Sequence, residues 1–312
     1  MTVLHVDENH PLLLEGFQKL GHQNEIAYTT PLATLWDQLD RYEGLIIRSR
    51  FPVDRSFLDQ AKNLKFIGRV GAGMENIDTR YAKSKGIAVF AAPEGNQNAV
   101  GEHTLCLLLG LLTKLRLGHS SIQSGQWLRE AHRGWELAGK TVGIIGYGTM
   151  GKSFAQKLVG MNVTVYCHDL LTNQGDAFAT QVPLERLQKE AQVISLHTDE
   201  NPTTQPLIDK AFIEAMEHPF WLLNTARGSA IATDALVDGL KNRKILGAGL
   251  DVLDYESKSF HSIFHQDPLP DALAYLLAAN NVLLSPHVGG WTVESHARLA
   301  TTILDKFKKH FH

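Results

Sequence analysis

Three polar residues of different chemistry lie in the second half of the chain, each shortly after an apolar run. Arg227 follows WLLN, Glu256 follows GLDV and His287 follows VLL. A guanidinium is a planar fork that binds a carboxylate through two hydrogen bonds and polarises the adjacent carbonyl. An imidazole exchanges a proton near neutral pH, and a carboxylate bonded to it fixes its tautomer and favours its protonated form. Oxidation of an alcohol beside a carboxylate needs these groups, so we predict that the three residues are catalytic.

Each of these residues also has an ordinary structural explanation. An arginine after a strand commonly forms a surface ion pair, a loop histidine is commonly hydrogen-bonded locally, and a loop glutamate is commonly solvated. Asp254 lies two residues before Glu256 and is an alternative partner for the histidine. The catalytic interpretation therefore depends on the order of the three residues after a nucleotide-binding motif.

That motif is VGIIGYGTMG, which spans Val142–Gly151. An apolar strand leads into it and a helical pattern follows. In dinucleotide-binding folds the first glycine permits a tight turn, the second lets the backbone approach a pyrophosphate, and the third lets helix pack on strand. We therefore predict a cofactor-binding segment made of Gly146, Tyr147, Gly148, Thr149, Met150 and Gly151.

Asp169 follows the next predicted strand, 18 residues after Gly151 (169 − 151). A carboxylate at this place accepts hydrogen bonds from a ribose 2′-hydroxyl and repels a 2′-phosphate. The structural alternative is a glycine turn followed by a surface aspartate. Strand, turn, helix and acid occur together here, and this combination favours NAD as the cofactor.

Apolar runs alternate with amphipathic stretches along the whole chain, which is typical of an α/β fold with parallel sheets. We predict strands over residues 3–6, 45–47, 65–70, 87–91, 141–146, 163–167, 193–197, 221–224, 245–250 and 282–285. We predict helices over residues 12–20, 77–84, 98–117 and 292–309. Each catalytic candidate then follows the carboxyl end of a strand, where open parallel sheets bind ligands.

Length and composition limit the classes of protein to consider. The 312 residues suffice for two domains, and a formal charge of −3 argues against a nucleic-acid partner. Cys106 and Cys167 lie in apolar stretches, which predicts buried, reduced thiols in a cytoplasmic protein. The N-terminus lacks the layout of a signal peptide, and the apolar run 105–112 is too short to cross a membrane. No metal site is expected.

Together the motifs resemble the D-isomer-specific 2-hydroxyacid dehydrogenase family over nearly the whole chain. The matching segments are VGAGMENID (Val70–Asp78), APEGNQNAVGEH (Ala92–His103), GKTVGIIGYGTMG, SLHTDENPTT, NTARG, GAGLDVLDYE and SPHVGG. The resemblance implies two Rossmann-like domains with the active site in the cleft between them. The substrate domain would be discontinuous, with residues 1–98 and 285–312, and the NAD-binding domain would be 99–284. It also implies the same catalytic residues and a homodimer formed mainly through the NAD-binding domain.

The resemblance assigns further residues. Asp251 would contact the nicotinamide carboxamide, and His197 and Thr225 would line the cofactor pocket. The substrate-binding residues would be Arg48, Ser49, Arg50, Val70, Gly71 and Ala72. The implied substrate is D-3-phosphoglycerate, with hydroxypyruvate, glyoxylate or D-lactate as alternatives.

The physical case for a phosphate site is that Arg48 and Arg50 end a strand and can clamp an anion, assisted by Ser49. Both arginines could equally be surface charges, since residues i and i+2 at a strand end need not both point inward. Arg69 is a further cation candidate, unless it forms an ion pair between the domains.

Some positions depart from the family pattern. Ser257 replaces the usual Pro after the catalytic Glu, and Trp291 replaces a small residue. Glu256 and His287 are 31 positions apart (287 − 256), more than usual, which predicts a loop insertion over 257–267. We expect the insertion and Trp291 to change the preferred substrate size, and we expect no regulatory C-terminal domain. A different class of function, an NAD-sensing scaffold, remains an alternative, although the chain lacks disordered tails that would recruit partners.

Overall fold

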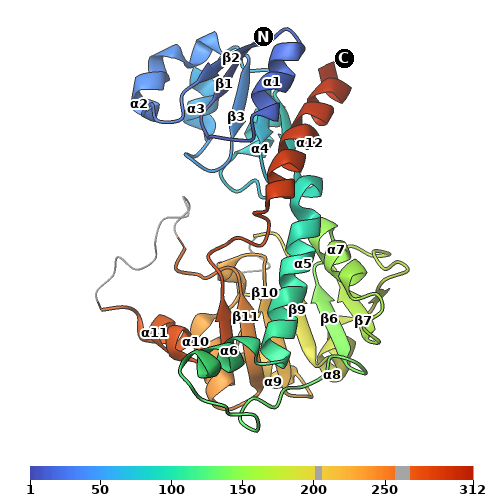
Figure 1. Cartoon of the computed structure of the whole chain (residues 1–312). Helices are drawn as coiled ribbons and strands as arrows, with labels where there is room; N and C mark the ends of the chain where they lie inside the picture. The colour runs from blue at the N-terminus through green and yellow to red at the C-terminus, as the bar shows by residue number, and fades with distance from the viewer. Residues whose placement is uncertain (201–205, 257–267, 312) are drawn as a thin grey trace. The chain divides into compact units, whose positions relative to one another are not determined.

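In the computed structural model, which describes residues 1–200, 206–256 and 268–311, all strand pairings are parallel (Figure 1). The chain divides into two units, one comprising Met1–Gln97 and Trp291–His312 and the other Asn98–Gly290. Each unit has its own sheet, so the predicted fold class is confirmed. The predicted insertion 257–267 lies outside the described residues.

The first unit contains a five-stranded sheet of order β2-β1-β3-β4-β5. The strands are β1 (Thr2–His5), β2 (Gln23–Ile26), β3 (Gly44–Ile47), β4 (Phe66–Arg69) and β5 (Ala88–Ala91). The helices are α1 (Leu12–Lys19), α2 (Leu32–Leu35), the 3₁₀ helix η1 (Trp36–Arg41), α3 (Arg55–Gln60), α4 (Thr79–Ser84) and α12 (Val293–Phe311). Ile46 of β3 shares a core with Phe17 of α1 and Phe307 of α12, so the C-terminal helix covers a sheet built by the N-terminal third.

The second unit contains a seven-stranded sheet of order β12-β11-β10-β9-β6-β7-β8. The strands are β6 (Thr141–Ile145), β7 (Thr164–His168), β8 (Thr180–Gln181), β9 (Val193–Leu196), β10 (Phe220–Asn224), β11 (Ile245–Leu250) and β12 (Val282–Leu284). The helices are α5 (Pro93–Leu112), whose first turn belongs to the first unit, α6 (Leu115–Gln123), α7 (Thr149–Lys157), α8 (Leu184–Glu190), α9 (Lys210–Ala215), η2 (Gly228–Ala230), α10 (Thr233–Lys241) and α11 (Asp271–Ala278). The order reverses between β6 and β9, the place where such sheets bind ligands.

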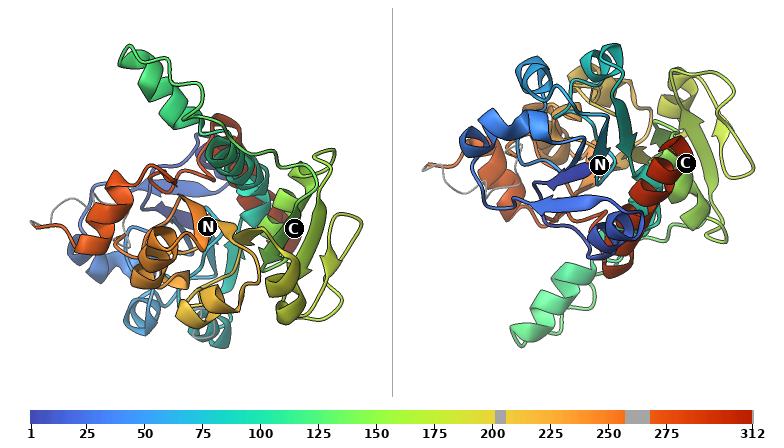
Figure 2. Two further views of the ribbon diagram at one scale, coloured as in Figure 1. Left: turned by 90° about the horizontal axis from the view of Figure 1, so that it is seen from below. Right: turned by 90° about the horizontal axis from the view of Figure 1, so that it is seen from above.

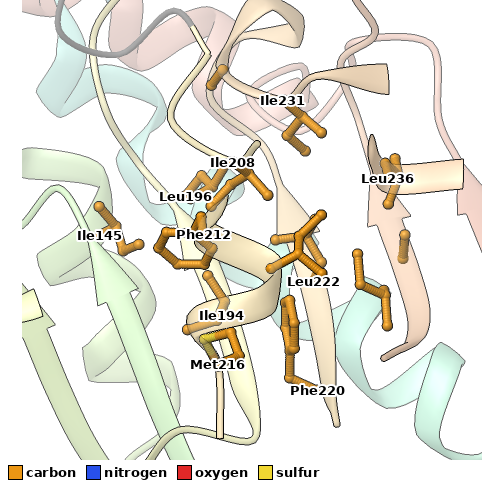
Figure 3. Packing of buried hydrophobic residues seen from close by; sticks show 14 of the residues in the cluster. Ile145, Ile194, Leu196, Ile208, Phe212, Met216, Phe220, Leu222, Ile231 and Leu236 are labelled. Carbon is orange, nitrogen blue, oxygen red and sulfur yellow. The ribbon is translucent and has the colours of Figure 1, made fainter. Parts of the chain in front are cut away.

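The two faces of this sheet carry separate apolar cores. Trp221 and Leu223 of β10 belong to the core that includes side chains of α5 and α7. Phe220 and Leu222 belong to the core on the other face, where Phe212 of α9 packs (Figure 3). Successive strand residues alternate between two buried faces, which explains why these strands read as continuous apolar runs.

Apart from the short helices that were not among the predicted elements, two strands and one long helix differ from the sequence prediction. Strand β2 (QNEI) was not predicted because it is an edge strand of mostly polar residues, and β8 is only two residues long. The single helix expected over 98–117 is wrong in its bounds. Lys114 adopts a left-handed conformation (φ 53°) and separates α5 from α6, which bends away by 62°. Figure 2 shows α6, in green, standing out from the rest of its unit.

No single helix in the described part of the chain has both the length and the apolar composition to span a membrane; α5 and α6 pass only as a bent pair. Both cysteines are unpaired. Cys167 is buried, as predicted, but Cys106 is exposed because it shares a face of α5 with the exposed Glu102 and Thr113.

Candidate active site

Arg227, Glu256 and His287 follow three adjacent strands, β10, β11 and β12, at the same edge of the second sheet. The Nδ1 atom of His287 lies 2.7 Å from Oε2 of Glu256. An ionised carboxylate only accepts hydrogen bonds, so Nδ1 carries a hydrogen and Nε2 is the basic nitrogen of the neutral ring. The imidazole is thereby prepared to take a proton at Nε2, and Glu256, not Asp254, is the acidic partner seen in the structure.

Glu256 is oriented by its own turn. Its Oε1 accepts a hydrogen bond from the backbone N–H of Leu253 at 2.6 Å, and its own N–H donates to the Leu253 carbonyl at 3.1 Å. One carboxylate oxygen is therefore fixed to the backbone while the other holds the imidazole. This arrangement gives the His287–Glu256 pair a defined geometry.

The turn that carries Arg227 packs against the turn that leads to Glu256. Gly228 makes this contact, since a Cβ at this position would lie 2.1 Å from the carbonyl carbon of Leu253 and 2.4 Å from the amide nitrogen of Asp254. Only glycine permits backbone to approach backbone so closely. The NTARG sequence therefore positions the arginine and also leaves room for the acidic turn.

Asn224, fully buried at the end of β10, shapes the arginine turn from inside. Its side-chain amide donates to the carbonyl of Arg227 at 2.8 Å, and its side-chain oxygen accepts from the N–H of Ala226 at 3.0 Å. The neighbouring Thr225 hydroxyl lies 3.0 Å from that of Thr104 on α5. The turn is thus fixed both to its own strand and to a helix.

The glycine loop after β6 has the geometry of a phosphate cradle. Gly146 has a left-handed φ of 86°, and a Cβ there would lie 2.6 Å from the carbonyl oxygen of His197. A Cβ on Gly151 would lie 2.2 Å from the Gly146 carbonyl, so this glycine is needed where α7 packs on the strand. A Cβ on Gly148 would meet nothing within 4 Å, so its backbone borders open space at the N-terminus of α7. Thr149 and Met150 form the first turn of that helix, whose unpaired N–H groups favour an anion.

Asp169 follows β7 directly and is tied to the glycine loop. Its carboxylate accepts hydrogen bonds from the N–H of Tyr147 at 2.7 Å and of Leu171 at 2.9 Å. Tyr147 is buried and donates its hydroxyl hydrogen to Asp176 at 2.8 Å; burial first, and then this bond, raise the pKa of Tyr147. A surface hollow beside the aspartate is lined by His168, Asp169, Thr172, Asn173, Gly175, Gln181, Val182 and Pro183.

His197 follows β9 directly, and its Nε2 lies 2.8 Å from the Ser195 hydroxyl. Burial lowers the pKa of His197 to about 3, so the ring is neutral at physiological pH. Its Nδ1 and the hydroxyl of Thr198 are buried with no hydrogen-bond partner among the described residues. Orphaned buried polar atoms need explanation, and a dinucleotide on the adjacent glycine loop would offer partners. The residues present therefore fit this cofactor.

Asp251 follows β11 directly and is 2% exposed. Its carboxylate accepts hydrogen bonds from the hydroxyl of Ser285 at 2.6 Å and from the N–H groups of Val288 at 2.9 Å and Gly289 at 2.7 Å. His103 of α5 lies 3.3 Å from the same carboxylate. Burial alone would raise the pKa of Asp251, but the bonds from these four groups outweigh it and lower the pKa. Ser285 and His103 were not predicted, although both lie in motifs that the sequence analysis singled out, SPHVGG and GEH.

In the first unit Arg48 follows β3 directly, next to the point between β1 and β3 where the strand order reverses. Its N–H donates to the carboxylate of Asp7, in the loop after β1, at 2.5 Å. Its guanidinium carbon lies 4.9 Å from the centre of a ring of Trp291, a favourable cation–π distance. The indole therefore covers one side of the guanidinium at a ligand-binding position of the fold.

Arg50 points to different partners. It donates to the backbone carbonyl groups of Val6 at 3.0 Å and Thr30 at 2.5 Å, and to that of Ala27. The structure therefore separates the two arginines, with Arg48 on Trp291 and Arg50 bonded to the loops after β1 and β2. Ser49 lies between them.

The loop of Val70, Gly71 and Ala72 follows β4. A Cβ on Gly71 would lie 1.5 Å from an Nη atom of Arg69, so the Arg69 guanidinium lies directly against this glycine.

Residues 105–289 match the family model described as the NAD binding domain of D-isomer specific 2-hydroxyacid dehydrogenases. The chain is 31% identical over 312 residues to a hydroxypyruvate reductase of Thermotoga maritima, with 99% of both chains covered. It is 29% identical to D-3-phosphoglycerate dehydrogenase 2 of Saccharomyces cerevisiae, covering 99% of this chain but 66% of the yeast protein. The structure of a D-lactate dehydrogenase from Aquifex aeolicus, complexed with NAD and lactic acid, superposes with a TM-score of 0.84 at 25% identity, covering 99% of this chain and 95% of that chain.

Proposed function

Because the chain belongs to the D-isomer-specific 2-hydroxyacid dehydrogenase family, we propose that it transfers a hydride between NAD and C2 of a D-2-hydroxy acid. The observation that carries this proposal is the 2.7 Å pairing of His287 with Glu256, in loops after β12 and β11, the two strands that continue the sheet from β10, after which Arg227 lies. A base oriented by an acid, with a guanidinium on the neighbouring strand, supplies the three groups that this reaction needs.

Each residue has a role in the chemistry. In the oxidising direction Nε2 of His287 takes the proton of the C2 hydroxyl, and in the reducing direction it returns that proton. Glu256 accepts the Nδ1–H bond and stabilises the imidazolium formed on the way. Arg227 binds the substrate carboxylate and polarises the C2 oxygen. NAD, when bound, supplies the hydride acceptor.

We assign the cofactor to the second unit. The loop Gly146–Gly151, including Tyr147, Gly148, Thr149 and Met150, would bind the pyrophosphate, and Asp169 the adenosine ribose. His197, Thr225 and Asp251 would surround the nicotinamide end. The open space over Gly148 and the orphaned Nδ1 of His197 support this assignment.

We propose D-3-phosphoglycerate as the preferred acid, with Arg48 and Ser49 binding its phosphate and the loop Val70, Gly71 and Ala72 completing the substrate domain. Arg48 lies at the reversal point of its sheet, which supports this role. Arg50 would act indirectly, by fixing the loops beside Arg48. Hydroxypyruvate is a second candidate, since the chain is 31% identical to a hydroxypyruvate reductase over 99% of both chains.

A substrate panel tests the proposal. NADH formation would be measured with D-3-phosphoglycerate, D-glycerate and D-lactate, and NADH consumption with hydroxypyruvate and glyoxylate. The highest kcat/KM on the phosphorylated acid supports the phosphate site. A preference for hydroxypyruvate or another unphosphorylated acid would leave the chemistry intact and remove Arg48 from phosphate binding.

We further propose a homodimer formed through α6 and the segment that follows it. No residue of α6 is buried, and large apolar side chains are exposed on it and after it: Leu115, Ile122, Trp127, Leu128 and Trp135. Such a patch is typical of an interface, and a second copy is the expected occupant. Light scattering tests this proposal, with a dimer expected for the wild type and a monomer for Trp127→Glu.

We also propose a cytoplasmic location, and the unpaired thiols of Cys106 and Cys167 are compatible with it.

A further inference from the structure

His103 of α5 begins a chain of hydrogen bonds inside the second unit. Its Nε2 lies 2.8 Å from the hydroxyl oxygen of Ser285, and that hydroxyl donates to Oδ1 of Asp251 at 2.6 Å. Ser285 has a single hydrogen, which is given to the carboxylate, so its oxygen must accept from His103. The Nε2 of His103 therefore carries a hydrogen, and the donors run in one direction, from helix to serine to carboxylate.

The loop that carries His287 is wrapped around this carboxylate. The N–H groups of Val288 and Gly289 both donate to it, and the N–H of His287 donates to the backbone carbonyl of Asp251 at 2.8 Å. A Cβ on Gly289 would lie 2.8 Å from Oδ2 of Asp251 and 3.3 Å from the ring of His103, so the loop lies directly against both groups. Three consecutive loop residues thus depend on one aspartate for their positions.

The loop has a conformation that needs such support. His287 adopts a left-handed backbone (φ 56°), which is uncommon and costly for a residue other than glycine. Strained conformations persist only where the surroundings over-determine them, and they cluster at functional sites. The bonds from Asp251 fix this backbone, while Glu256 fixes only the side chain.

We infer that His103, acting through Ser285 and Asp251, is a positioning residue that fixes the loop of His287 in its reactive placement. This inference rests on the proposed function, in which His287 is the base. His103 holds Ser285 so that the serine donates to the aspartate, and its Nε2 also lies 3.3 Å from Oδ1 of the same carboxylate. We call His103, Ser285 and Asp251 together the His103 clamp.

The test compares two replacements of the same residue. His103→Leu removes the donor, whereas His103→Gln keeps an N–H close to the position of Nε2. Displacing a reacting group by about 1 Å can cost about a hundredfold in rate, so we expect kcat to fall at least tenfold in the Leu variant and to recover to within threefold in the Gln variant. The KM for the acid and the Kd for NADH, measured by fluorescence, should change less than twofold in both. Ser285→Ala should resemble the Leu variant.

A matched control separates positioning from stability. Ile213→Val removes one methylene from the core on α9, outside the clamp, and should lower Tm without changing kcat per NADH-binding site. A wild-type kcat in the Leu variant, or a Gln variant no better than Leu, would overturn the inference.

The inference can fail independently of the proposed function. If the wild type transfers no hydride to any acid, the ring signals of His287 in NMR, assigned with His287→Ala, still report the position of the loop. We expect these signals to shift in His103→Leu and to return in His103→Gln. Unshifted signals in the Leu variant would refute the clamp whatever the activity.

Discussion

Replacing Gly228 by Ala should damage catalysis far more than stability or cofactor binding. The added Cβ would lie 2.1 Å from the carbonyl carbon of Leu253, where 3.4 Å is the shortest ordinary contact, so the two turns must separate by about 1.3 Å (3.4 − 2.1). The clash is with backbone, which cannot rotate away as a side chain can. The turn of Arg227 would therefore move relative to the turn of Glu256.

A displacement of this size corresponds to about a hundredfold in rate. We expect kcat/KM for the acid to fall by about that factor while the Kd for NADH stays within threefold, because the glycine loop is untouched. Stopped-flow fluorescence and steady-state rates on the same preparation measure both quantities.

Gly239→Ala is the matched control for this variant. Its Cβ would lie 2.8 Å from the end of the Ile245 side chain, which is crowded but free to adjust, and it lies in α10 of the same unit. We expect its kcat/KM to stay within twofold of the wild type. If Gly228→Ala is as active as the wild type, the close approach of the two turns does not position the catalytic groups, and our account of the NTARG turn is wrong.

Three further predictions concern the substrate, the cofactor and pH. Arg48→Ala should raise the KM for D-3-phosphoglycerate at least tenfold and that for D-lactate less than twofold, since a hydrogen bond to a charged group contributes about 1.5–3 kcal/mol; equal changes would show that Arg48 does not bind the phosphate. Asp169→Ala should lower the ratio of kcat/KM with NAD to that with NADP at least tenfold, because the carboxylate that repels a 2′-phosphate is lost; an unchanged ratio would remove Asp169 from cofactor selection. Burial lowers the pKa of His5 to about 4, and its hydrogen bond to Asn24 opposes this only partly. As the pH falls, His5 therefore binds a proton at a higher pH in the unfolded chain than in the folded one. The contribution of His5 should therefore lower the free energy of unfolding by about 3 kcal/mol between about pH 6.5 and pH 4. In urea unfolding, the free energy of unfolding of His5→Phe should fall less steeply with pH than that of the wild type. An identical pH dependence in both proteins would contradict the assignment.

The fold was predictable because its signals are local. Apolar runs mark the buried parallel strands, and in the loop after β6 Gly146 marks a left-handed turn and Gly151 a close approach of backbone that the structure contains. The edge strand β2 was not predicted because its mostly polar residues show no apolar pattern. The end of α5 was not predicted because Lys114 adopts a left-handed conformation, and no glycine or proline marks this position in the sequence.

The site was predictable only in part, because its contacts are distant in sequence. His103 and Ser285 are 182 positions apart, and no spacing rule joins them. Arg50 looks like a ligand-binding residue in sequence, yet its donors go to carbonyl groups of the loops after β1 and β2, which only the folded chain reveals. The residue types were visible in the motifs, whereas their partners were set by the packing of elements inside each unit.

The central claim is that His287 is the base in hydride transfer from a D-2-hydroxy acid to NAD. Its most direct test is NADH formation from the D and L enantiomers of the preferred acid, in the wild type and in His287→Ala. We predict turnover of the D form alone, and a kcat at least about a hundredfold lower in the variant with the Kd for NADH unchanged, since general base catalysis contributes about 10²–10⁴ in rate. Equal use of both enantiomers, or a variant as active as the wild type, would contradict the account.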